Sequence, residues 1–242
     1  ETLGPAMLVY RELFHATGAT SMVVSHASMR DGLLLDMARS VAGVEDATTS
    51  EGVIHAAITL AEKYHVDVTH TGHVAELSVR LFNELRSEHG LGVRHCLLLR
   101  VAAVLHEVGS FVSSRAHHKH SYYLIANSEL FGLTREELRI VAHVSRYHRR
   151  SGPKTSHVEY MALPRESRMV VSKLAAILRV ADVLDRGHMQ AIRDMECRRQ
   201  DEDFVLMIRG MRDLSLERAA LGSKADLFED IYGMRVRLEE AL

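Results

Sequence analysis

The stretch LRVADVLDR, residues 178–186, decides the fold because it places acidic side chains on a helix that is otherwise apolar. Apolar residues recur three and four positions apart from Leu174 to Ala181, as they do on the buried face of a helix. Asp182 lies between aliphatic neighbours, and burial of its carboxylate is costly unless a positive group holds it. The stretch therefore predicts a core helix over residues 168–185 that carries a charged side chain into the interior.

Helical spacing recurs throughout residues 50–188, where there is almost no strand signal. Further helices are expected at residues 53–64, 71–86, 94–107, 122–127 and 135–148. Ser50 is the expected N-cap of the helix at 53–64. Thr134 followed by Glu137 matches the sequence pattern of a capping box at the start of the helix at 135–148. Because the connections are short, we expect a helical bundle.

The residues before this bundle predict a smaller region that must pack against another part of the protein. Residues 1–49 indicate a helix, a short strand at Ser21–Ser25 and a second helix at Arg30–Arg39, which is too little to close a core alone. The acidic, Thr-rich residues 45–50 mark the expected boundary. The chain has no initiator Met and no signal-peptide layout, so we expect it to begin in the middle of a fold.

After the bundle, the spacing of apolar residues changes from that of helices to a mixture of strand and helix spacing. These residues predict a hairpin of Met195–Arg199 and Phe204–Arg209, then a helix over Leu216–Asp230 and a last strand at Met234–Leu238. This pattern indicates a small α+β appendage. The expected fold is mainly α, and its three regions are residues 1–49, 50–189 and 190–242.

Composition excludes several classes of protein. The 242 residues carry a net charge of −2, which argues against a chain that coats nucleic acid through bulk charge. No apolar run approaches the roughly 20 residues of a membrane helix. The two cysteines are too few for a disulfide framework, so we expect a reducing, cytoplasmic setting.

Histidine is unusually frequent, with 16 residues in the chain and ten of them between His70 and His148. Such a density indicates metal or proton chemistry, although scattered surface histidines would be the simpler interpretation. His70 and His73 are three positions apart and share a helix face, so either can project into the bundle. His106 and Glu107 precede Gly109, where we expect the helix to end and both side chains to reach past it.

Two imidazoles, a Glu and Asp182 make a mixed nitrogen and oxygen ligand set for a divalent ion. Each residue alone is a weak signal, because a single histidine is more often an ordinary core or surface residue. The order of His, then His-Glu, then Asp along the chain is more specific.

Basic residues gather in two segments, 110–128 and 138–158, that contain no acidic residue. Arginine forks match phosphate oxygens, so one interpretation is a phosphate-binding wall. The alternative is a solvated helix end whose cations favour the C-terminus of the helix dipole. The cations in question are Arg115, Lys119, Arg146, Arg149, Arg150 and Lys154.

The order of these motifs resembles the HD domain, a helical metal-dependent phosphohydrolase module. Taken over nearly its whole length, the sequence resembles the C-terminal half of the exopolyphosphatase / guanosine pentaphosphate phosphohydrolase (Ppx/GppA) family. The matching pieces are HEVG (106–109), HHKHSYYLI (117–125), NSELFGL (127–133), RYHRR (146–150), LRVADVLDR (178–186) and FEDIYGMRVRL (228–238). SHASMRDGLL at 25–34 resembles the tail of that family's actin-like phosphatase domain.

The resemblance implies a ligand set and a departure from it. The HD metal ligands fall on His70, His106, Glu107 and Asp182, with Mn, Mg, Fe or Zn as the divalent ion. By analogy with two-metal HD proteins, His120 and His148 are candidates for a second ion. Glu107 stands where the HD pair has Asp, which moves the carboxylate outward by one methylene.

Two functions follow from the resemblance. In the first, the chain is the HD-like part of an exopolyphosphatase-type phosphohydrolase, binds polyphosphate or guanosine polyphosphate, and forms a homodimer. The catalytic actin-like domain would then be absent from this chain, which has no glycine-rich phosphate loop. In the second, the chain is a self-sufficient HD phosphohydrolase that uses a metal-activated water on a phosphate ester or anhydride. Neither function implies a nucleic acid or a membrane as partner.

Overall fold

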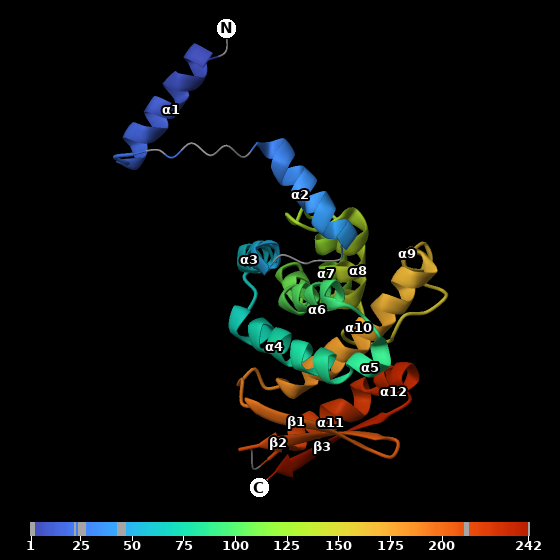
Figure 1. Ribbon diagram of the computed structural model, residues 1–242. Coiled ribbons are helices and arrows are strands. Elements are labelled where there is room, and N and C mark those ends of the chain that lie inside the picture. The colour runs from blue at the N-terminus through green and yellow to red at the C-terminus, as the bar shows by residue number, and fades with distance from the viewer. Residues whose placement is uncertain (1–2, 22, 24–27, 43–46, 211–212, 242) are drawn as a thin grey trace. The chain divides into compact units, whose positions relative to one another are not determined.

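The computed structural model describes residues 3–21, 23, 28–42, 47–210 and 213–241 (Figure 1). The chain divides into two compact units, residues 1–44 and 45–242. In the first unit, α1 spans Leu3–Thr17 and α2 spans Met29–Ala42. Ser28 caps α2, since its hydroxyl accepts from the Asp31 backbone N–H at 3.2 Å while its own N–H donates to the Asp31 carboxylate at 2.9 Å.

The strand expected at Ser21–Ser25 lies mostly outside the described residues. Ser21 and Val23 are the described residues of that stretch, and neither is in a strand. On α1, the apolar side chains of Leu8 and Leu13 are more than half exposed.

The second unit begins with a helical bundle. Its helices are α3 (Ala47–Lys63), α4 (Val68–Glu84), α5 (Arg86–His89), α6 (Val93–Leu105), α7 (His117–Ala126), α8 (Arg135–Arg146), α9 (Val158–Met161) and α10 (Arg165–Leu184). A 3-10 turn, η1 (Val108–Phe111), follows α6. Together with the C-terminal part these elements confirm the mainly α fold class.

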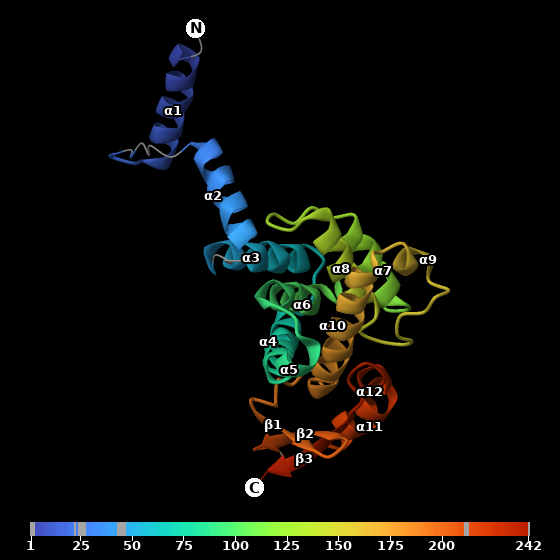
Figure 2. The same cartoon turned by 45° about the vertical axis from the view of Figure 1, so that its right-hand side comes forward.

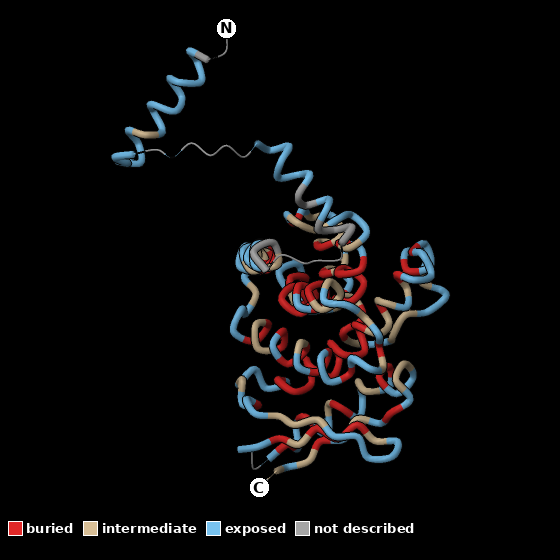
Figure 3. The backbone as a smooth tube through the Cα atoms, in the orientation of Figure 1, coloured by how far each residue is buried: buried red, intermediate tan, exposed pale blue. Residues whose placement is uncertain are grey.

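Helix α10 is the centre of this unit. Every residue from Leu174 to Asp185 is buried, so the helix is enclosed on all sides rather than along one stripe. It packs against α4 and α8 in the bundle and against two helices of the appendage, α11 (Ser215–Lys224) and α12 (Asp226–Tyr232) (Figure 2). The buried residues concentrate along α6, α8 and α10 (Figure 3), which places the core around the predicted helix.

Some predicted helix ends are confirmed and others are wrong. The capping box is present, because the Thr134 N–H donates to the Glu137 carboxylate at 2.8 Å and the Glu137 N–H donates to the Thr134 hydroxyl at 3.2 Å. Ser50 is not an N-cap, because α3 already starts at Ala47 and Ser50 lies inside the helix. Helix α7 begins at His117, five residues before the expected start, because its first turn buries His117 and His118 in place of apolar side chains.

The C-terminal appendage is α+β, as predicted. Strands β1 (Asp194–Gln200) and β2 (Asp203–Arg209) form an antiparallel hairpin, and β3 (Arg235–Ala241) pairs in parallel with β2. The expected single helix is two, α11 (Ser215–Lys224) and α12 (Asp226–Tyr232). The break has a cause, since Arg179 of α10 donates to the Lys224 carbonyl at 2.8 Å, an oxygen that would otherwise accept a helical bond.

Across the described residues, none of the helices combines the length and apolarity that a bilayer crossing requires.

Gly109 has a different role from the helix end predicted for it, because α6 already ends at Leu105. A Cβ at Gly109 would overlap the backbone of α7, with the His120 carbonyl carbon at 2.8 Å and the His117 oxygen and Ser121 nitrogen closer still. The Gly109 N–H also donates to the Ser121 hydroxyl at 2.9 Å. The glycine therefore permits the close approach of η1 and α7.

We expect Gly109→Ala to lower the free energy of unfolding by at least about 2 kcal/mol, because backbone cannot yield as a side chain does. Urea denaturation measures this change. The control is Gly72→Ala in α4, where an added Cβ meets nothing within 4 Å and the free energy should stay within about 1 kcal/mol of the parent. Equal effects of the two substitutions would contradict the close packing.

Candidate functional site

The candidate site lies where three bundle helices meet. His70 is in the first turn of α4, His106 directly follows α6, and Asp182 is in the last turns of α10. The start of α4 is set by Asp67, whose carboxylate accepts from the backbone N–H groups of Thr69 at 3.0 Å and His70 at 3.2 Å. His70 and His106 are completely buried and Asp182 is 6% exposed.

The side chains of these three residues converge. Oδ1 of Asp182 lies 3.6 Å from Nε2 of His106 and 3.8 Å from Nε2 of His70, and the three atoms are all within 4.8 Å of one another. These separations are too long for hydrogen bonds. They fit a shared ion, because two ligand atoms each about 2.1 Å from one ion are at most about 4.2 Å apart.

The other ring nitrogen of each histidine is held. Nδ1 of His70 donates to Oδ2 of Asp185 at 2.7 Å, and Nδ1 of His106 donates to the Ala103 carbonyl at 2.6 Å. In a neutral imidazole this leaves Nε2 as the atom with the lone pair. Within the described part of the chain, neither Nε2 has a hydrogen-bond partner, although buried polar atoms are nearly always paired. Orientation of a ring by its second nitrogen is typical of metal-ligating histidines.

Electrostatics separate the roles of these groups. Burial lowers the pKa of His70, which favours the neutral ring. Burial works against ionisation of Asp182, but the imidazole of His106 and the ammonium of Lys224 outweigh it and hold the pKa of Asp182 well below its usual value. Burial also opposes protonation of His106, yet the nearby carboxylates of Asp182 and Glu107 raise its pKa. The carboxylate of Asp182 is therefore an anion inside the bundle.

The second oxygen of Asp182, Oδ2, is bound by the Nζ of Lys224 from α11. This lysine is the positive group that the sequence required for a buried aspartate. It comes from the appendage, 42 residues along the chain from its partner. The site thus joins the bundle and the appendage.

A strained loop closes the site after α10. His188 and Gln190 both have positive φ, of 54° and 48°, a conformation that costs free energy for residues other than glycine. The His188 ring stacks on His70 at 3.6 Å between centroids. The Gln190 backbone N–H donates to Asp185 Oδ1 at 2.7 Å and its side-chain amide donates to Oδ2 at 3.1 Å. The loop therefore fixes the carboxylate that orients His70.

Glu107, expected as a ligand beside His106, is partly exposed and belongs to a different group of side chains. Its carboxylate lies within 4.8 Å of ring nitrogens of His70 and His188. His70 is common to this group and to the group with His106 and Asp182. The ligand role of Glu107 stays a prediction.

A row of imidazoles continues from His106 toward the surface. The ring centroids of His106 and His148 are 4.9 Å apart, and those of His148 and His117 are 5.2 Å apart. His148 Nδ1 donates to the Ser145 carbonyl at 2.6 Å, so its Nε2 accepts from His117 Nε2 at 3.1 Å. His117 Nδ1 then accepts from Arg149 at 3.2 Å. His117 is thus the ring beside His148, while the predicted partner His120 is partly exposed three residues further along α7.

Several of the predicted phosphate-binding cations lie near the outer end of this row. Burial and then the charge of Arg149 lower the pKa of His117 to about 4. Burial and the charges of Arg149, Lys119 and Arg146 likewise contribute to a pKa of about 4 for His118. Arg146 also pairs with Glu159 at 3.5 Å, an acid one residue beyond the acid-free segment. Arg115, Arg150 and Lys154 are exposed.

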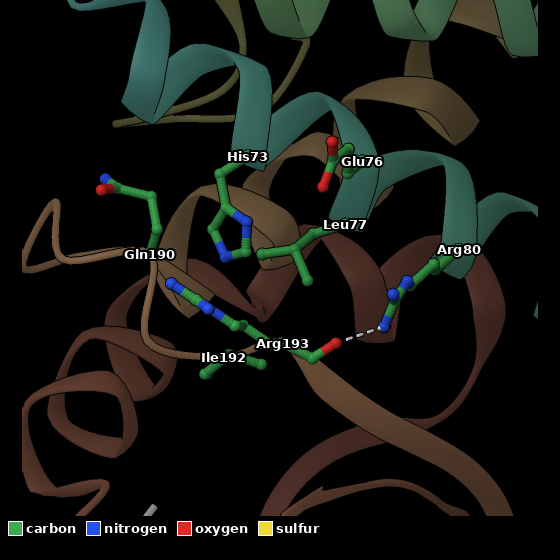
Figure 4. Close-up of a pocket in the computed structure, with 7 residues that line it drawn as sticks. All are labelled: His73, Glu76, Leu77, Arg80, Gln190, Ile192 and Arg193. Atoms are coloured by element: carbon green, nitrogen blue, oxygen red, sulfur yellow. Dashed lines mark hydrogen bonds between the residues drawn. The ribbon is translucent and has the colours of Figure 1, made fainter.

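His73, the alternative to His70, lies in a separate pocket of about 280 Å³ between α4 and the segment before β1 (Figure 4). Its Nε2 is buried with no hydrogen-bond partner among the described residues. The pocket is lined by His73, Glu76, Leu77, Arg80, Gln190, Ile192 and Arg193. Gln190 lines this pocket and also donates to Asp185, so the pocket and the candidate site share this residue.

Sequence reasoning missed several residues of the site. Asp185 directly follows α10, three residues after Asp182, so helical spacing was an available signal for its role. His117 is in the quoted histidine cluster but has no local feature that separates it from His120. Lys224 and His188 carry no signal, because only the folded chain brings them to the site.

Comparisons with known proteins agree with this picture. A family model described as "Ppx/GppA phosphatase, domain III" matches residues 54–227. Similar proteins include three called guanosine-5'-triphosphate,3'-diphosphate pyrophosphatase. The one from Pseudoalteromonas translucida is 28% identical over 60% of this chain and 28% of its own length. The one from Aeromonas hydrophila is 25% identical over 84% of this chain and 39% of its own. The one from Vibrio cholerae is 26% identical over 82% of this chain and 38% of its own.

The matched regions span 28–39% of the length of these three relatives. The match to the family model covers most of the chain, including α4, α6 and α10, which supply the site. These matches confirm the resemblance drawn from the motifs. The chain belongs to the Ppx/GppA phosphatase family, and residues 54–227 are its domain III.

Proposed function

We propose that this chain binds polyphosphate or a guanosine polyphosphate as the C-terminal, HD-like part of an exopolyphosphatase-type phosphohydrolase. The observation that carries the proposal is the placement of Arg149, whose guanidinium contacts the His117 ring at the outer end of the imidazole row. Lys119 and Arg146 are close enough to lower the pKa of the neighbouring His118. A polyanion needs several such cations, because each phosphate group needs its own counter-charge.

The relatives support the chemistry of this ligand. Their name describes a guanosine with phosphates at both the 5' and the 3' position, which is itself a polyanion. For the whole protein we propose that polyphosphate cleavage belongs to an actin-like domain outside this chain. We also propose that the protein acts as a homodimer.

A second candidate function is metal-dependent phosphohydrolysis at the buried site. The Nε2 atoms of His70 and His106 have no hydrogen-bond partner in the described part of the chain, and together with Asp182 they form a nitrogen and oxygen set suited to a divalent transition metal. A bound ion would polarise a phosphoryl oxygen and make a coordinated water more acidic. Asp185 and the Ala103 carbonyl would orient the two rings, and Arg149 would hold the phosphate.

We expect the double variant Arg149→Glu/Arg150→Glu to bind inorganic polyphosphate at least about tenfold more weakly at low salt, because charge-assisted bonds are lost and replaced by repulsion. Fluorescence anisotropy with labelled polyphosphate measures the affinity. The difference should shrink as salt is added, because exposed charges are screened.

The matched control for this experiment is Arg135→Glu/Arg165→Glu, which makes the same change of charge in the first turns of α8 and α10. It should leave the affinity close to that of the parent. If both double variants bind as the parent does, residues 146–154 are only a solvated helix end and the binding proposal fails.

For the buried site, we expect isothermal titration with Zn²⁺ or Mn²⁺ to show a single tight site. Asp185→Asn should weaken ion binding by about 10–100-fold, because a neutral amide then replaces the carboxylate that accepts from Nδ1 of His70. His55→Gln, at an exposed position of α3, is the control and should titrate as the parent. Equal titrations for all three proteins would place the ion elsewhere.

A further inference from the structure

We infer that Lys224 is a resident cation of the candidate metal site, where it neutralises Asp182 in the absence of a divalent ion and competes with such an ion for this carboxylate. The inference rests on the metal site proposed above and adds a residue from the appendage to it. Nothing in the HD-like motif requires a lysine at this place.

The two oxygens of Asp182 have different surroundings. Oδ1 faces the Nε2 atoms of His70 and His106, at 3.8 and 3.6 Å. Oδ2 is bound by the Lys224 ammonium. The side chains are almost completely buried, at 8% exposed for Asp182 and 13% for Lys224. A buried carboxylate without a counter-charge is strongly destabilising, so this contact supports the apo fold.

Lys224 is fixed at its backbone as well as at its ammonium group. Arg179, three residues before Asp182 on α10, donates from Nε to the Lys224 carbonyl at 2.8 Å. Its Nη2 donates to the Asp226 carboxylate at 2.7 Å. Helix α10 therefore holds both ends of this lysine, one through Arg179 and the other through Asp182. Such a lysine differs from a mobile surface side chain that contacts an acid by chance.

A divalent ion at the site would lie beside this ammonium. Like charges at short range in a buried environment repel strongly. Oδ2 of Asp182 is already bound by Lys224, so the oxygen that faces the two histidines and is open to the ion is Oδ1. Ion binding and the Lys224 contact therefore oppose each other. By linkage, the Lys224 contact weakens ion binding by the same factor as ion binding weakens the contact.

The test compares Lys224→Met with the parent by isothermal titration with Zn²⁺ or Mn²⁺ and by thermal unfolding. We expect Lys224→Met to bind the ion at least about tenfold more tightly, because the competing charge is gone. Without metal the variant should unfold at a lower temperature than the parent, and saturating ion should remove most of that difference. Lys224→Arg keeps the charge and should retain the parent's affinity. Lys63→Met, at the exposed end of α3, controls for loss of a lysine.

The possible outcomes separate the inference from the metal site itself. Equal ion affinities for the parent and Lys224→Met would overturn the inference and leave the metal site standing. Binding to Lys224→Met alone would support the inference and contradict metal use by the parent. Absence of binding to either would overturn both, without touching the polyanion proposal. If Lys224→Met is unfolded without metal, refolding on addition of the ion supports the inference, and failure to refold overturns it.

Discussion

The burial of one carboxylate, that of Asp182, is the constraint on which the rest of this structure depends. An anion enclosed by aliphatic neighbours in a core helix is unstable unless its environment is arranged around it. His106 approaches it from the end of α6, His70 from the start of α4, and Lys224 from α11. Each of these elements thus has a reason to dock against α10 beyond the burial of apolar surface.

Three polar residues, spaced three positions apart along α10 and its C-terminal end, connect this helix to the elements around it. Arg179 holds the junction of α11 and α12, Asp182 binds Lys224 and faces the two histidines, and Asp185 binds His70 and the loop at Gln190. Residues three apart lie on the same side of a helix, so these contacts form a continuous polar strip in an apolar environment. The strip joins the bundle to the appendage beside the apolar core, which also continues from one into the other.

The sequence predicted the elements whose signals are local. The core helix, the capping box at Thr134 and the hairpin follow from spacing. The family motif predicts one group of His70, His106, Glu107 and Asp182, of which the structure groups three and places Glu107 with His70 and His188 instead. The start of α7 was wrong because histidines there are buried like apolar residues. The break after Lys224 was missed because its cause, the guanidinium of Arg179, comes from a helix 45 residues away. The identity of the group that neutralises Asp182 likewise depends on tertiary structure.

The distance along the chain between the members of this polar strip has a consequence for folding kinetics. His70 and Asp185 are 115 residues apart, and Lys224 and Asp182 are 42 apart. Closing such loops costs chain entropy before any contact repays it, so non-local contacts of this kind slow folding. Until α11 docks, Asp182 favours water over the interior. We therefore expect α10 to complete its packing around Asp182 only when the appendage docks.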